Sequence, residues 1–204
     1  MLLFHGTTIE NAEKIQKEGF GYNKKVWDCS LAETYFFTED FFWEESSADD
    51  FSEMWNFAVT ETLDQARIAL AVENPKDYRG AVLVFDTELM KNGSDIQADY
   101  SCIGMEDMAV ALCDPDMKGL VAVIHSNHDE RESRPFWLAS LQQREFFCMP
   151  ELSIFNQTIV ETLADTDFCE VLDELRLCDE NKTTWINKNY LTQDHFPEEL
   201  EEAV

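Results

Sequence analysis

Basic residues are scarce in this sequence. Its 204 residues include 15 Lys and Arg against 42 Asp and Glu, which gives a formal net charge of -27 at pH 7. Proteins that bind nucleic-acid backbones rely on clustered Lys and Arg, and the only adjacent basic pair here is Lys24-Lys25. The composition disfavours a nucleic-acid partner and favours a basic protein as partner or substrate. Solubility alone is the competing explanation for the charge.

Long apolar runs are also missing. No stretch reaches the roughly 18 apolar residues of a membrane-spanning helix. The segment MLLFHGTT lacks the basic flank, apolar core and small-residue cleavage site of a secretion signal. We therefore expect a cytoplasmic protein, of the producing or the host cell, that has no membrane association.

Recognisable metal and nucleotide motifs are absent. The six cysteines form no Cys-x-x-Cys pair, which predicts reduced and mostly buried thiols. His125 and His128 have no third His or Cys nearby to complete a metal site, so we expect no metal. Neither G-x-G-x-x-G nor G-x-x-x-x-G-K-[ST] occurs, and a bound nucleotide would need another device.

The order of apolar patterns predicts an α+β fold. Strand patterns occupy residues 2–5, 33–38, 81–86 and 119–124, and further strands are expected within residues 136–155. Helical spacing occurs between a Thr7–Glu10 capping box and Gly19, and again over residues 62–72 and 162–178. Residues 44–53 look like a loop, and the polar run 125–135 is expected to be exposed. Mostly antiparallel sheets flanked by helices follow from this order. We place one domain at residues 1–160, with a C-terminal helix and acidic tail, residues 161–204, packed on it.

The first strand leads into three residues suited to binding a nucleotide. The imidazole of His5 at a strand end can donate to a ribose hydroxyl. Gly6 has no side chain, so its backbone can approach a flat amide closely. Thr7 can contribute to the same site, or serve only as a helix cap.

Five segments in a fixed order carry a family resemblance: LLFHGTTIENAEKIQKEGF, YFFTED, DQARIALAVENP, AVLVFD and REFFCMPELSI. Together they resemble the ADP-ribosyltransferases of the diphtheria-toxin and poly(ADP-ribose) polymerase type. The resemblance spans about half of the chain in three blocks. It implies a catalytic domain with split antiparallel sheets that uses NAD as its substrate and needs no metal.

Glu145 is the catalytic carboxylate that this resemblance implies. Cleavage of the nicotinamide–ribose bond passes through a transition state with growing positive charge on the ribose, and a fixed carboxylate stabilises that charge. The resemblance also makes His5, Gly6 and Thr7 NAD-binding residues, and it gives His5 and Tyr35 catalytic roles beside Glu145. Without the other blocks, Glu145 would be taken for an exposed strand residue of an acidic protein.

The nicotinamide ring needs flat partners, and the strand TYFFT offers three aromatic rings. The family usually has Tyr on this strand and a second aromatic on the next helix. The best register here places Phe36 at the first position and Ile68 at the second. Either Tyr35 stacks on the nicotinamide after a shift of one residue in this register, or Phe36 and the aliphatic Ile68 form the walls of the nicotinamide pocket. Core packing is the competing role for each of these rings.

The residues that could contact the acceptor or the pyrophosphate are less clearly indicated by the sequence. In the family that the chain resembles, the residues just before the catalytic glutamate form an acceptor loop, and Glu two positions before it is associated with arginine acceptors. Gln143 occupies that position here, so we expect an acceptor other than arginine. Trp137 beside this acceptor loop can contact a target protein or belong to the core. Lys24-Lys25 or Arg67 would offset the pyrophosphate charge, unless they are solvated surface residues.

The sequence thus predicts an NAD-dependent mono-ADP-ribosyltransferase that modifies a protein, as a toxin, an effector or a phage-type modifier of a host protein. Three alternatives remain open. The acceptor can be a nucleic acid or a small molecule. RNA 2'-phosphate transfer uses a related fold and NAD but needs basic residues. Finally, the chain can be a catalytically decayed, acidic binding or inhibitory module.

Overall fold

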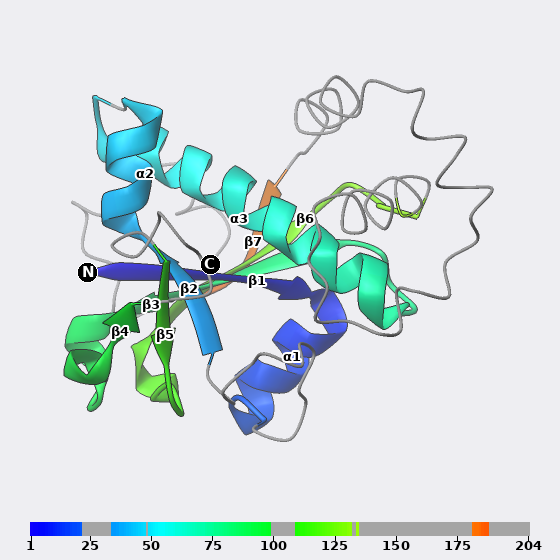
Figure 1. The fold of residues 1–204 in the computed structure, drawn as a ribbon. Coiled ribbons are helices and arrows are strands. Elements are labelled where there is room, and N and C mark those ends of the chain that lie inside the picture. Colours follow the sequence, from blue (N-terminus) through cyan, green and yellow to red (C-terminus); the bar gives the residue numbers. More distant parts are fainter. Residues whose placement is uncertain (22–33, 48, 99–108, 132–133, 135–180, 188–204) are drawn as a thin grey trace.

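The computed structural model describes residues 1–21, 34–47, 49–98, 109–131, 134 and 181–187, which form an α+β fold (Figure 1). Its strands are β1 (Leu2–Thr8), β2 (Thr34–Thr38), β3 (Gly80–Asp86), β4 (Gln97–Ala98), β5 (Ala109–Leu112), β6 (Leu120–Ser126) and β7 (Asn181–Ile186). Its helices are α1 (Ile9–Glu18), α2 (Glu39–Ser46) and α3 (Phe51–Glu73), with short 3-10 turns at Thr87–Leu89, Gly93–Asp95 and Met117–Gly119.

The described strands form one antiparallel sheet in the order β4-β5-β2-β1-β3-β6-β7. The apolar segments at 2–5, 33–38, 81–86 and 119–124 all become strands, since each matches an element in position to within three residues. The predicted α+β class with antiparallel pairing is confirmed.

The sheet has two arms that share a short contact between β1 and β2. Strand β1 pairs with β3 from Leu2 to Thr8, but its pairing with β2 joins only Leu3 to Thr38 and Phe4 to Phe37. Along its other edge, β2 pairs with β5 over residues 34–37. Figure 1 shows β2 and β5 steeply inclined to β1. One arm is therefore β4-β5-β2 and the other is β1-β3-β6-β7.

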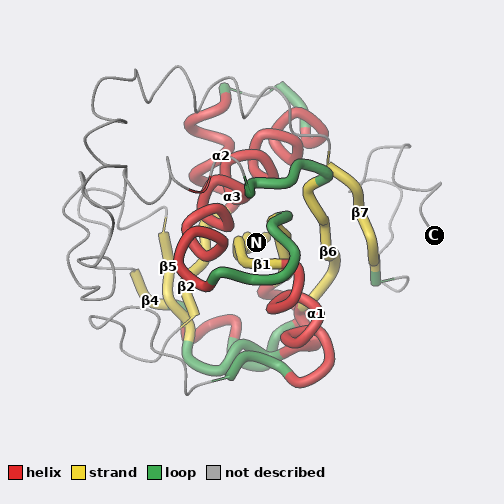
Figure 2. The backbone as a smooth tube through the Cα atoms, turned by 90° about the vertical axis from the view of Figure 1, so that its right-hand side faces the viewer, coloured by secondary structure: helices red, strands yellow, loops and turns green. Residues whose placement is uncertain are grey.

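Helices cover both faces of the sheet. Figure 2, viewed nearly along β1, shows α2 and α3 on one side and α1 on the other. The α3 side buries Leu2, Phe4, Phe42 and Trp55 in one core cluster. The α1 side buries Leu3, Ile9, Phe36, Leu83 and Phe85 in a second cluster. Because strand side chains alternate between faces, β1 contributes to both clusters.

Helix α3 lies unusually close to the sheet where it crosses β1 and β3. A Cβ atom on Gly6 would lie 2.3 Å from the carbonyl oxygen of Thr62 and 2.8 Å from the backbone nitrogen of Ala66. On Gly80 it would lie 3.1 Å from the Ala66 side chain. Two glycines and an alanine thus allow the helix backbone to contact the strand backbone.

The helix boundaries depart from the sequence prediction in two places. The N-cap of α1 is Thr8, whose Oγ1 accepts from the Asn11 amide at 3.1 Å, and not Thr7, which is a buried β1 residue. The loop predicted at residues 44–53 is shorter than expected, because α2 continues to Ser46 and α3 begins at Phe51. The Asp50 carboxylate caps α3 by accepting from the Glu53 amide. Polar capping residues suggested a loop here, but they mark a helix start.

Later parts of the chain are only partly described. The expected strands within 136–155 and the expected helix at 162–178 lie outside the described residues, whereas β7 was not predicted. In the part described, no helix combines the length and apolar character needed to cross a membrane.

Candidate functional site

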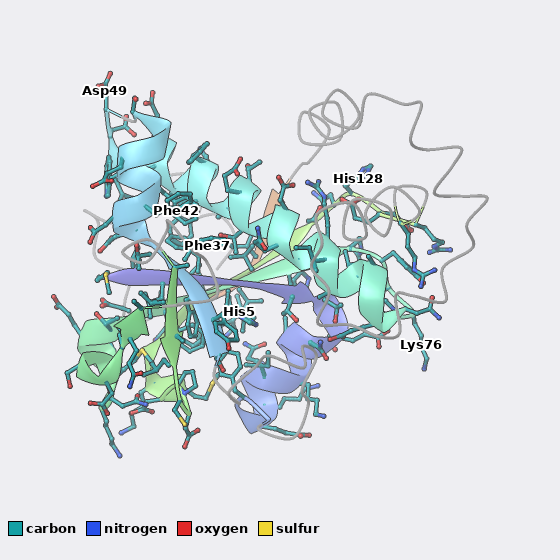
Figure 3. The ribbon with its side chains drawn as sticks, viewed as in Figure 1. His5, Phe37, Phe42, Asp49, Lys76 and His128 are labelled. Carbon is teal, nitrogen blue, oxygen red and sulfur yellow. The ribbon has the colours of Figure 1, made fainter. Side chains whose placement is uncertain are left out.

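His5 lies at the point where β1 and β2 separate. Its Nδ1 donates to the backbone oxygen of Tyr35 at 2.8 Å. The His5 ring meets the Phe20 ring edge-on, with centroids 5.2 Å apart, and the tilted Phe36 ring at 5.5 Å. Figure 3 shows His5 on the side of β1 opposite Phe37 and Phe42. The imidazole is thus fixed by one hydrogen bond and two aromatic contacts.

The hydrogen bond to Tyr35 determines which ring nitrogen of His5 carries the proton. Burial lowers the pKa of His5 below its ordinary value of 6.5, although the hydrogen bond to Tyr35 opposes the shift. A carbonyl oxygen can only accept, so the neutral ring carries its proton on Nδ1 and leaves Nε2 as an acceptor. The expectation that His5 donates to a ribose hydroxyl is reversed, because Nε2 would accept from that hydroxyl.

The lowered pKa of His5 predicts that acid destabilises the fold. Above pH 6.5 the imidazole is neutral in the folded and in the unfolded chain. Below pH 6.5 the unfolded chain takes up the proton first, so the free energy of unfolding falls as the pH falls toward the folded-state pKa of His5. His125, whose pKa is lowered by burial and by Arg79, acts in the same direction. We expect urea unfolding to show a loss of stability from pH 7.5 to 5.5 that is smaller in His5→Asn. An amide at position 5 can still donate to Tyr35 but does not titrate, so an unchanged slope would contradict this assignment.

The two predicted walls for nicotinamide do not face each other. Phe36 is buried on the α1 side of the sheet, next to His5 and Phe85. Ile68 belongs to α3, on the opposite side. It is also two residues, about 200° of helix turn, from Ala66, which faces the sheet. The prediction that Phe36 and Ile68 enclose one ring is wrong, because the sheet lies between them.

Tyr35 takes part in the site through its backbone. Strand alternation puts its side chain on the face opposite Phe36 and His5, and that side chain is half-buried. Its carbonyl oxygen holds the His5 ring. Of the two sequence alternatives, Phe36 is the ring beside His5 and Tyr35 is the residue that orients the imidazole.

Gly6 and Thr7 have structural roles that the sequence did not indicate. The Cα of Gly6 faces the α3 backbone, so the missing side chain serves helix packing. Thr7 is 5% exposed and pairs with Ala81 of β3. Neither role involves the backbone edge toward β2. After Phe4, β1 and β2 are no longer paired. The backbone N-H and C=O groups that alternate residues of β1 direct toward β2 therefore have no β2 partner in the sheet.

A buried ion network on α3 was missed by the sequence analysis. Arg67 is 1% exposed, and it donates from Nε to Glu130 and from a terminal nitrogen to Asp64. Glu130 is 2% exposed, although the polar run 125–135 was expected to be exposed. Arg67 therefore does not provide a surface charge for a pyrophosphate. The i, i+3 spacing of Asp64 and Arg67 was the only sequence signal for this network.

Glu145, Gln143, Trp137 and Lys24-Lys25 lie outside the described residues. Within the described ranges, no group of three or more His, Cys, Asp or Glu side chains is arranged to hold a metal ion. Searches with this chain match no protein-family model, no curated protein and no solved structure.

Proposed function

We propose that the chain is an NAD-dependent mono-ADP-ribosyltransferase with an ADP-ribosyltransferase-like fold that modifies a protein. The observation that carries this proposal is the oriented imidazole of His5 beside β1 backbone groups that have no β2 partner in the sheet. A dinucleotide offers matching groups: ribose hydroxyls that donate to Nε2, and a flat carboxamide that both donates and accepts.

In the proposed reaction, the bond between nicotinamide and the ribose C1' breaks and nicotinamide leaves with the bonding electrons. The acceptor nucleophile forms a new bond to C1' and releases its proton to solvent. His5 orients the ribose, and Phe36, next to His5, contributes an apolar wall. The carboxylate that stabilises the ribose cation is proposed to be Glu145. Such a preorganised group accounts for roughly 100-fold to 1000-fold in rate.

The test is nicotinamide release and transfer of labelled ADP-ribose from NAD in a cell lysate. We expect the wild type to label protein and Glu145→Gln to lose about 100-fold or more of that activity. Glu18→Gln, which removes an exposed α1 carboxylate, is the matched control and keeps full activity.

Two substitutions test the role of His5, because each one keeps the hydrogen-bonding capacity of one ring nitrogen. His5→Asn can retain the Nδ1 bond to Tyr35 but has no group at the Nε2 position, and His5→Gln reverses this choice. We expect His5→Asn to raise the KM for NAD while the fold persists. If wild type binds NAD without turnover, the acidic binding module is favoured; if it neither binds nor cleaves NAD, the proposal fails. The net charge of -27 is the observation that keeps the module as second candidate.

A further inference from the structure

The hairpin formed by α2 and α3 presents partly exposed aromatic rings. Phe41 and Trp43 flank the fully buried Phe42 in α2. Phe57 on α3 and Phe37 on β2 pack against the same core and are also only partly buried. We call three partly buried residues the aromatic row: Phe37, Phe41 and Phe57. Trp43 lies two residues, about 200° of helix turn, from Phe41 and therefore on the other flank of α2. Aromatic side chains on a surface are typical of the centre of a protein interface.

Neighbouring rings hold the aromatic row in place. Phe37 and Phe41 are stacked, with centroids 5.6 Å apart and an interplanar angle of 23°. Phe42 connects the two helices, with its centroid 5.0 Å from that of Phe41 and 6.0 Å from that of Phe57. Rings that are already ordered lose little conformational entropy when a partner binds. The row is therefore a preorganised contact surface.

Acidic side chains are exposed on the same hairpin as the aromatic row. The exposed carboxylates of the hairpin belong to Asp40, Glu44, Asp49, Asp50 and Glu53. The stretch from Thr34 to Ala66 contains nine Asp and Glu and no Lys, Arg or His. Figure 3 shows Asp49 at the tip of the hairpin. Two of the nine have cationic partners outside the stretch, Glu39 at the N-terminal ammonium and Asp64 at Arg67. No Lys, Arg or His within the stretch balances the exposed carboxylates, so the surface is complementary to positive charge.

We propose that the aromatic row docks a segment of a partner protein rich in Lys and Arg. The alkyl parts of such side chains cover the rings, the cationic groups lie over ring faces, and the charges reach the exposed carboxylates of the hairpin. A nucleic acid or an acidic protein would be repelled by the same carboxylates. The inference concerns partner binding and does not depend on NAD chemistry.

The test is fluorescence anisotropy of a labelled peptide rich in Lys and Arg, titrated with the full chain. The triple variant Asp40→Lys, Glu44→Lys, Glu53→Lys removes charge at the row. Glu18→Lys, Glu88→Lys, Asp95→Lys makes the same net change at exposed positions elsewhere. We expect the first set to raise the Kd about 10-fold or more, which is about 1.4 kcal/mol, and the control set to raise it about 2-fold through general charge.

A single ring variant separates the row from the charge. Phe41→Leu keeps the net charge and an apolar side chain, and we expect it to weaken peptide binding about 3-fold through the lost ring face. Thermal unfolding confirms that each variant is folded, and Phe41→Leu carries the test if the triple variant does not fold. Equal weakening by both charge sets, no effect of Phe41→Leu, or no binding by wild type would each overturn the proposal.

Discussion

Replacing Arg67 with Met is expected to lower the free energy of unfolding by about 3–5 kcal/mol. The guanidinium is the positive partner of Asp64 and Glu130, and all three side chains are buried. Methionine fills similar space but leaves two carboxylates without that partner in a region of low dielectric constant, where an uncompensated charge is costly. Equilibrium unfolding in urea measures the change.

Arg79→Met is the matched control for Arg67→Met. Arg79 also pairs with an aspartate, Asp77 at 2.7 Å, but its side chain is 41% exposed and water screens the pair. We expect this variant to cost at most about 1 kcal/mol. Arg67→Lys should fall between the two, because an ammonium keeps the charge without the fork that reaches both acids. Similar costs for Arg67→Met and Arg79→Met would show that the buried network adds no particular stability.

Substitution of Gly6 with Ala is expected to destabilise the protein by about 3 kcal/mol. The added Cβ would lie 2.3 Å from the Thr62 oxygen and 2.8 Å from the Ala66 nitrogen. Both are backbone atoms of α3, so no side-chain rotation can relieve the clash and the helix must move off the sheet. The expected sign is a lower urea midpoint with an unchanged slope.

Gly21→Ala provides the comparison for Gly6→Ala. Among the described residues, no heavy atom lies within 4 Å of a Cβ added at Gly21, so this substitution is expected to be neutral or stabilising by a few tenths of a kcal/mol. A Gly6→Ala protein as stable as Gly21→Ala would mean that α3 does not approach β1 so closely. This packing role also affects any activity measurement. Loss of NAD turnover in Gly6→Ala would reflect displaced α3 as well as any lost contact, which makes His5→Asn the cleaner probe of the site.

Local sequence was sufficient to predict the principal strands. The segments 81–86 and 119–124 are short apolar runs, and both form buried strands, β3 and β6. Gly19 ends α1 with a positive φ of 78°, a conformation that glycine adopts readily. Local patterns failed at 44–53, where the same polar residues that favour turns also cap helices. They also failed for Glu130, whose polar neighbours suggested exposure although its partner Arg67 is 63 positions away.

The sequence by itself determined the fold class and the antiparallel character of the sheet, because these depend on periodicity and on the order of apolar segments along the chain. The tertiary structure decided which groups meet. It gave Gly6 to helix packing, separated Phe36 from Ile68 by a sheet, and set the proton of His5 through the Tyr35 carbonyl. These outcomes depend on which face of a strand a helix covers and on where two strands part, and both are fixed by contacts between residues far apart in the chain.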